Sequence, residues 1–123
     1  MSSYSWSKIP TEKLTEKLGR KFISGKKIML AQLFLKKGCV VAAHSHESEQ
    51  MTYILSGSMT FRLQDKEVTL NAGDVLNIPS GVEHSAVALE DTLDLDAFSP
   101  IREDWIKGTH LFKSGILTAT QTL

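Results

Sequence analysis

Three of the four histidines in this chain stand in two short polar stretches that could hold a metal ion. His44 and His46 are two residues apart in "HSHESEQ", and His84 follows "PSGVE" farther along the chain. Neutral imidazoles with an oxygen ligand suit zinc, iron, nickel, manganese or copper, and ligand type alone does not separate these metals. The sequence therefore predicts a site for one divalent transition metal, provided that the fold brings the two stretches together.

The residues before His44 and His46 indicate which side chains would face the metal site. Side chains alternate between the two faces of a strand, so His44 and His46 should share a face with Val40 and Ala42. Cys39 should then point away and should not be a ligand. By itself an HxH pair is also typical of two exposed histidines near a turn, so the prediction depends on the third histidine.

A second stretch that could do chemistry is "LDLDAFSPIREDW", residues 93–105. Strand alternation puts Asp94, Asp96 and Phe98 on one face. A large aromatic side chain is unfavourable on a solvent-facing strand, so we expect Asp96 and Phe98 to look into the metal cavity. Arg102 at its rim would suit bidentate binding of a carboxylate. The alternative for Arg102 is a surface ion pair with a neighbouring acid, worth at most about 1 kcal/mol.

Short strands separated by turns must position these side chains. Residues 10–20 read as a short helix, because Leu14 and Leu18 are spaced four apart and Gly19 suits a stop. After that segment, turn signals recur roughly every eight to ten residues, which is typical of an all-β sandwich or barrel. We therefore expect one domain over residues 1–123, with a barrel core over roughly 20–100.

Two turns carry specific expectations. Gly57 and Ser58 separate "MTYILS" from "MTFRL", a pattern that favours a hairpin. Pro79 suits the second position of a type I turn and Gly81 its fourth, so His84 should begin a new strand.

Composition excludes several classes of partner. Fourteen basic residues balance fourteen acidic ones, so no basic field exists to hold a nucleic acid, and no basic block suggests a membrane surface. Cys39 is the only cysteine, which excludes an intrachain disulfide. The first ten residues lack the apolar core of a signal peptide, and a cytoplasmic location is expected.

The spacing of these residues resembles the two sequence motifs of the cupin superfamily. The first motif corresponds to Gly38, five residues, His44-Ser45-His46, three residues, Gln50, six residues and Gly57. The second corresponds to Gly73, five residues, Pro79-Ser80-Gly81, two residues, His84, three residues and Ala88. Gln50 stands where the family pattern has glutamate, and Ala88 where it has asparagine. The resemblance implies a small double-stranded β-helix, or jelly-roll barrel, with His44, His46, Gln50 and His84 as metal ligands.

The fourth ligand is open to three interpretations. A glutamine oxygen can bind a metal without adding charge, which would leave the ion a stronger Lewis acid toward an anion. The six-residue gap to Gly57 favours Gln50, whereas Glu49 next to it is the competing ligand. In the third interpretation the site has lost its metal.

The run Asp96, Phe98, Ser99-Pro100 and Arg102 to Trp105 narrows the resemblance to small single-domain cupins of the pectin-degradation, KdgF-like type. Members of this type convert unsaturated uronates into linear keto sugars. The resemblance implies a small anionic substrate, Asp96 and Arg102 as catalytic residues, and Phe98 and Arg102 as substrate-binding residues.

Two other functions remain open: an iron-dependent cupin dioxygenase, and a non-catalytic cupin that binds a sugar acid through its metal. The resemblance also implies a homodimer, formed through "KFIS" or "KIMLAQLF". His110 lies beyond both motifs and is expected at the surface.

Overall fold

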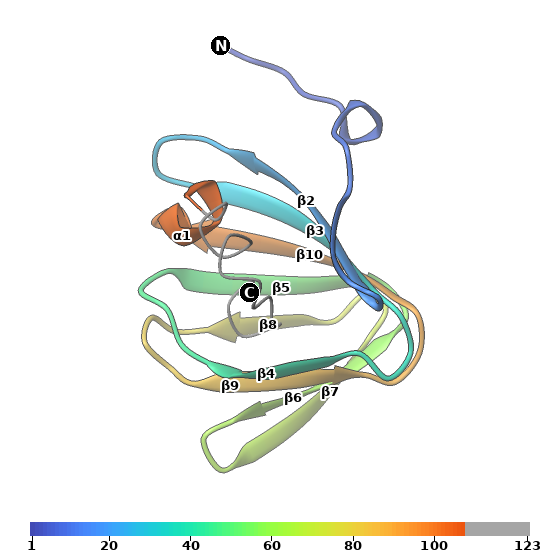
Figure 1. Ribbon diagram of the computed structural model, residues 1–123. Helices are drawn as coiled ribbons and strands as arrows, with labels where there is room; N and C mark the ends of the chain where they lie inside the picture. Colours follow the sequence, from blue (N-terminus) through green and yellow to red (C-terminus); the bar gives the residue numbers. More distant parts are fainter. Residues whose placement is uncertain (108–123) are drawn as a thin grey trace.

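In the computed structural model, residues 1–107 are described and form two antiparallel β-sheets that face each other (Figure 1). The six-stranded sheet has the order β1-β2-β3-β10-β5-β8, and the four-stranded sheet the order β4-β9-β6-β7. The all-β prediction is confirmed. His110 lies outside the described residues. The strands are β1 Glu12–Thr15, β2 Leu18–Ser24, β3 Met29–Leu35, β4 Val40–His44, β5 Glu49–Ser56, β6 Ser58–Leu63, β7 Lys66–Asn71, β8 Val75–Ile78, β9 His84–Ala88 and β10 Thr92–Ser99.

The N-terminal helical segment is a short 3₁₀ turn, Trp6–Lys8, and it does not extend over residues 10–20 as the leucine spacing predicted. Those residues form the hairpin of β1 and β2. Leu14 and Leu18 are both buried, because the chain reverses between them and both side chains reach the core. The spacing of four came from a tight turn, which periodicity alone does not distinguish from one helical turn.

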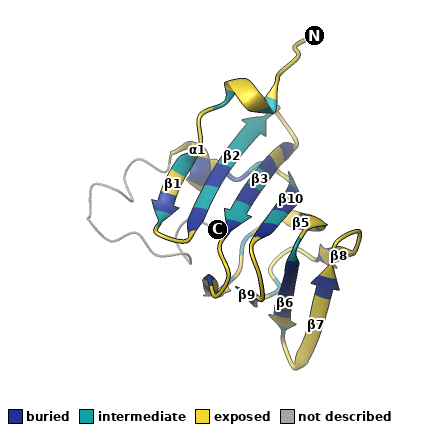
Figure 2. Cartoon of the chain, turned by 90° about the vertical axis from the view of Figure 1, so that its right-hand side faces the viewer, coloured by how far each residue is buried: buried dark blue, intermediate teal, exposed yellow. Residues whose placement is uncertain are grey.

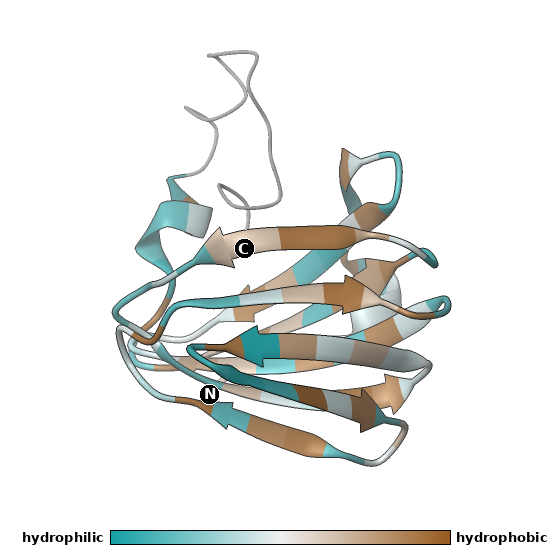
Figure 3. Cartoon of the chain, turned by 90° about the horizontal axis from the view of Figure 1, so that it is seen from below, coloured by the Kyte–Doolittle hydropathy of each residue, from teal (hydrophilic) through white to brown (hydrophobic). Residues whose placement is uncertain are grey.

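Apolar side chains from both sheets fill the space between them. In β3, Met29, Ala31, Leu33 and Leu35 are buried, whereas Leu30 is exposed on the outer face. Figure 2 shows buried residues along β3, β10 and β6, and a largely exposed β7 at the edge of the four-stranded sheet. Figure 3 shows apolar segments on strands of both sheets. One hydrophobic core therefore joins the two sheets.

The predicted hairpin around Gly57 is wrong, because β5 and β6 belong to different sheets. β5 pairs with β10 and β8, while β6 pairs with β7 and β9. Gly57 has a φ of +94°, and a Cβ there would lie 2.4 Å from both the Asp91 carbonyl oxygen and Thr92 Oγ1. Only glycine fits where the chain crosses from one sheet to the other.

The β4–β5 and β8–β9 connections lie at the same end of the molecule as helix α1, Glu103–Ile106 (Figure 1). The β8–β9 turn runs from Pro79 to Val82, whose backbone nitrogen donates to the Pro79 carbonyl at 3.2 Å. Gly81 is therefore its third residue, with a φ of +77°, and not the fourth as predicted. The Gly81 nitrogen also donates to the His46 carbonyl at 2.9 Å, which ties the two connections together.

Among the described residues, no helix has the length and apolarity needed to cross a membrane.

Candidate metal centre

Three imidazoles from distant parts of the chain meet at this end of the molecule. His44 lies at the end of β4, His46 just beyond it, and His84 at the start of β9. One ring nitrogen of each residue lies within 4.8 Å of one ring nitrogen of each of the others. His44 and His84 face each other in the register of β4 with β9, and their ring centroids are 4.3 Å apart. The predicted histidine cluster is present.

The strand parity predicted around this cluster is wrong, and a β-bulge explains why. The β4–β9 register shifts between Val41 and His44, so the side chains do not alternate regularly there. Val40 is 63% exposed, whereas Val41 is buried and lines the same cavity as His44. Cys39 also lies in the core, not on the outer face, but it is not part of the histidine cluster.

The hydrogen bonds of the imidazoles fix which ring nitrogens face the centre. Nδ1 of His44, His46 and His84 lies 2.9, 2.8 and 2.9 Å from the carbonyl oxygens of residues 42, 48 and 82. A carbonyl oxygen only accepts, so each Nδ1 carries the hydrogen and each Nε2 presents a lone pair. Nε2 of His84 is buried with no hydrogen-bond partner among the described residues. The donors therefore fit a metal ion, whose histidine ligands commonly donate their other nitrogen to a carbonyl.

Burial favours the neutral form of the His84 and His46 imidazoles. It lowers the pKa of His84 from 6.5 to about 4, and it lowers the pKa of His46 as well, with the Arg102 charge acting in the same direction. Both rings are therefore unprotonated at neutral pH, as metal ligands must be.

The two candidates for the fourth ligand, Gln50 and Glu49, differ in burial and in the face of β5 on which they lie. Gln50 is buried, and its Oε1 lies 3.0 Å from Nε2 of His46. Glu49 points to the opposite face of β5, is exposed, and accepts a hydrogen bond from Asn77 at 2.9 Å. Because strand alternation allows only one of these neighbours to face the cavity, Gln50 is the side chain that accompanies the histidines.

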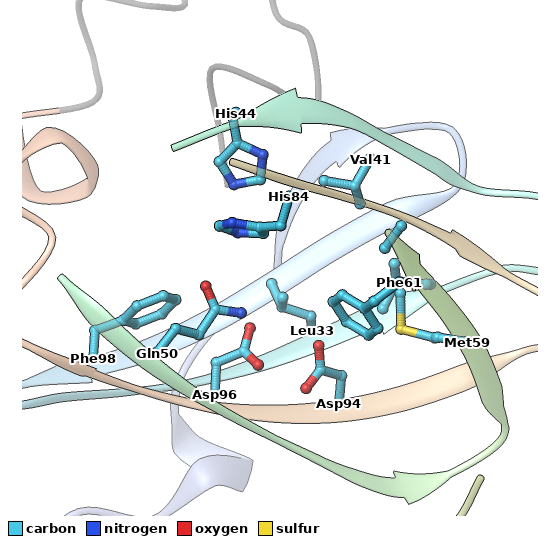
Figure 4. A pocket seen from close by; sticks show the side chains of 12 residues that line it. Leu33, Val41, His44, Gln50, Met59, Phe61, His84, Asp94, Asp96 and Phe98 are labelled. Carbon is cyan, nitrogen blue, oxygen red and sulfur yellow. The ribbon is translucent and has the colours of Figure 1, made fainter. Parts of the chain in front are cut away.

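The space between the two sheets at this point is small. The cavity lined by His44, Gln50 and His84 has a volume of about 20 Å³, enough for one water molecule or ion. Figure 4 shows the two histidines on one side, with Gln50, Asp96 and Asp94 facing them from the other sheet. Three nitrogen donors and one amide oxygen suit a divalent transition metal, which would supply Lewis-acid chemistry there.

Asp96 lines this cavity as predicted, and Asp94 lies beside it. Burial and the charge of Asp96 raise the pKa of Asp94 well above its ordinary value. Burial raises the pKa of Asp96 too, but hydrogen bonds from Asp94 and Thr52 and the charge of Arg102 oppose this. Asp94 is therefore the member of the pair that takes up a proton more readily. Asp94 lies on the face that strand alternation predicted for it together with Asp96, but no role was predicted for Asp94.

Phe98 and Arg102 lie between the cavity and helix α1. The Phe98 ring is buried, with its centroid 5.7 Å from that of His46. Arg102 is only 4% exposed, and its guanidinium carbon lies 5.3 Å from the Phe98 ring centroid and 4.9 Å from that of Trp105. Nε and Nη2 of Arg102 donate to Asp104 at 3.0 and 2.8 Å. The pair with an acid considered from the sequence exists, but its guanidinium is buried against two aromatic rings.

This bidentate pair has an electrostatic consequence. Burial alone would raise the pKa of Asp104, but the hydrogen bonds and the charge of Arg102 lower it. Beside the pair, a recess of about 360 Å³ is lined by Lys26, residues 46–48 and residues 100–104. His46 lines this recess and is also a member of the histidine cluster.

Comparison with known proteins agrees with this architecture. The cupin domain model matches residues 32–99. The structure of KdgF from Halomonas sp. superposes with a TM-score of 0.79 at 29% sequence identity, covering 84% of this chain and 98% of that one.

Two curated proteins match shorter parts of the chain. The oxalate-binding protein of Thermotoga maritima is 35% identical over 80 residues, 64% of this chain and 64% of that protein. The acireductone dioxygenase of Yarrowia lipolytica is 46% identical over 46 residues, 33% of this chain. The chain thus spans 27% and 64% of the lengths of the dioxygenase and the oxalate-binding protein.

Proposed function

This chain belongs to the cupin family and resembles the small KdgF-like type in fold, and from that premise we propose that it is a metal-dependent enzyme acting on a small sugar acid. The substrate class we propose is the 4,5-unsaturated uronates, which it would open and convert to the ketone. One observation carries the proposal: three imidazoles and one amide oxygen face a buried aspartate pair across a space the size of one ion.

The charge of this site suits an anionic substrate. His44, His46, Gln50 and His84 would hold the ion without neutralising it, so a bound divalent ion would keep its full charge to bind a carboxylate and stabilise enolate-like oxygen. Arg102 lies buried at the recess, with its positive charge paired to Asp104. Its role would be to orient the substrate carboxylate or neutralise its charge, in addition to its pairing with Asp104.

The proposed reaction is an isomerisation and needs no co-reactant. The bond between the ring oxygen and the anomeric carbon breaks, and the anomeric hydroxyl loses its proton as the aldehyde forms. The former ring oxygen becomes the enol oxygen at C5, and C4 gains a proton as the ketone forms. Asp96 is our candidate for proton transfer, because it borders the cavity and burial raises its pKa. Phe98 would shape the sugar pocket beside His46.

The test is the ultraviolet absorbance of an unsaturated uronate, which disappears as the double bond is consumed. The protein loaded with a divalent metal should accelerate this loss, and Asp96→Asn should slow it by about 10²-fold or more while retaining metal. Glu49→Gln is the matched control, because Glu49 faces away from the cavity. A decay rate equal to that of the protein-free solution would contradict the proposal.

The oxalate-binding relative favours a second candidate, which is binding of a small organic acid without turnover. The same four donors and Arg102 would hold a carboxylate equally well in a binding protein. Calorimetry with oxalate and with a uronate separates the two functions: tight binding with unchanged ligand favours a binder, and consumption of the uronate favours the enzyme.

The match to an acireductone dioxygenase keeps an iron-dependent dioxygenase as a further alternative. Oxygen uptake by the iron-loaded protein with an acireductone-type enediol would support it. Equal consumption of oxygen with and without the protein would count against it.

We also propose that two copies pair through the outer face of the six-stranded sheet. Exposed apolar side chains lie there on β3, β5 and β8, and half-buried side chains of β10 join them. Ala97 lies between Leu30 and Met51, and Leu95 lies beside Tyr53, which is opposite Val75. A contiguous apolar patch of this kind marks an interaction surface in many proteins. The predicted interface segment "KIMLAQLF" contributes Leu30 to this patch.

We also propose a cytoplasmic location. The single cysteine, Cys39, agrees with a reducing compartment such as the cytoplasm.

A further inference from the structure

A chain of buried hydrogen bonds runs from the histidine cluster into the six-stranded sheet. Nε2 of Gln50 donates to Oγ1 of Thr52 at 2.8 Å, and Oγ1 of Thr52 donates to Oδ1 of Asp96 at 2.7 Å. Gln50 and Thr52 are two apart on β5, and Thr52 lies directly opposite Asp96 on β10. Thr52 and Asp96 are 0% and 1% exposed, so water does not compete for these bonds.

The direction of these bonds follows from the number of hydrogens available. A carboxylate oxygen accepts hydrogen bonds, and Oδ1 of Asp96 is the acceptor here. Thr52 has one hydroxyl hydrogen, and that hydrogen goes to Asp96. The Thr52 oxygen can therefore only accept from Gln50, and it accepts from the amide nitrogen. The oxygen of the Gln50 amide must then point the other way, toward the imidazoles, which is the orientation drawn in Figure 4.

At its other end, the amide oxygen meets a second acceptor. Nε2 of His46 presents a lone pair, because Nδ1 of that ring donates to the Ser48 carbonyl. The two acceptors lie 3.0 Å apart and repel each other unless a cation binds both. A free amide would instead rotate and donate its NH₂ group to His46. Thr52 holds the amide against that rotation, since the flipped amide would turn a second acceptor, its oxygen, toward a Thr52 oxygen that has no hydrogen to give.

From this geometry we infer that Thr52, directed by Asp96, is a positioning residue that holds the Gln50 carbonyl toward the metal site. The inference rests on the proposed function only in taking the histidine–glutamine cluster as a metal site. It assigns a role to a residue that neither touches the candidate ion nor carries a charge. Asp96 would then have a second role, which is to orient the Gln50 amide through Thr52.

The experiment measures nickel affinity, with Ni²⁺ as the probe and a chromophoric chelator as the competitor. Thr52→Val keeps the shape of the side chain and removes the hydroxyl, and it should weaken nickel binding by about 10- to 100-fold, the usual effect of losing a partner that orients a ligand. Thr52→Ser keeps the hydroxyl and should bind nickel within about threefold of the wild type. Thermal unfolding of each metal-free variant shows whether it is folded before affinity is compared.

A double-mutant cycle separates positioning from a general structural role. In a Gln50→Ala background the amide is absent, so adding Thr52→Val should not weaken nickel binding further. Equal affinity of Thr52→Val and the wild type would overturn the inference, and so would an undiminished loss in the Gln50→Ala background. Absence of nickel binding by the wild type would overturn the metal proposal and this inference with it. Nickel binding by the wild type without uronate turnover would contradict the proposed reaction but not this inference.

Discussion

Acid should destabilise the metal-free protein, and His84 should account for a defined part of the loss. His84 is only 3% exposed to solvent, and this burial lowers its pKa from 6.5 to about 4. Because the folded pKa lies below the unfolded one, the unfolded chain binds the proton more strongly between these values. The contribution of neutral His84 to stability is therefore complete above pH 6.5 and falls as the pH drops toward 4.

The size of the effect follows from the two pKa values. For a group that titrates at 6.5 in the unfolded chain and at about 4 in the fold, the free energy of unfolding falls by about 2.5 kcal/mol between pH 7.5 and pH 4.5. His46 acts in the same direction, because its pKa is also lowered by burial. Asp94 and Asp96 act in the opposite direction, because their raised pKa values let the fold take up protons before the unfolded chain does.

A variant isolates the His84 part from these other groups. His84→Gln removes the titration and keeps a polar side chain, so the difference in unfolding free energy between wild type and variant should itself change by about 2.5 kcal/mol over this pH range. Urea unfolding in the presence of a chelator, at several pH values between 7.5 and 4.5, measures that difference. If the two proteins lose stability in parallel, His84 is not held neutral by burial and the reasoning fails.

Three further predictions concern the fourth ligand, the sheet crossing and the dimer. Gln50→Ala should weaken Ni²⁺ binding by at least about tenfold, whereas Glu49→Gln should leave it unchanged, as measured by competition with a chelator. Gly57→Ala should lower the free energy of unfolding by at least about 2 kcal/mol more than Gly73→Ala in urea titrations, because the two φ angles are alike but a Cβ meets nothing within 4 Å at Gly73. Met51→Lys should convert the proposed dimer to a monomer in light scattering, and an unchanged mass would contradict the proposed interface.

The ligand types and the fold class could be predicted from the sequence, because both depend on residue spacing within short segments of the chain. The spacing of His44, His46 and His84 from turn glycines identified the cluster, since each residue occupies a fixed place relative to its own strand end. The alternation of Asp94, Asp96 and Phe98 on one strand identified the opposite wall of the cavity. These predictions needed only the period of a strand and a resemblance in spacing.

What the sequence missed depends on partners that are distant along the chain. The bulge that turns Val41 inward exists only in the pairing of β4 with β9, and the assignment of β5 and β6 to different sheets is a property of the whole fold. Likewise, Leu14 and Leu18 looked helical because the return of the chain between them is not visible in their spacing.

The sequence by itself determined that imidazoles and an amide or carboxylate oxygen were available at the right spacing. Only the tertiary structure decided that Gln50 and not Glu49 accompanies the imidazoles, because their faces follow from the pairing of β5 with β10 and β8. It alone placed Thr52 between Gln50 and Asp96. The physical reason is that the direction of a hydrogen bond is set by both of its partners, and these partners lie on strands far apart in the chain.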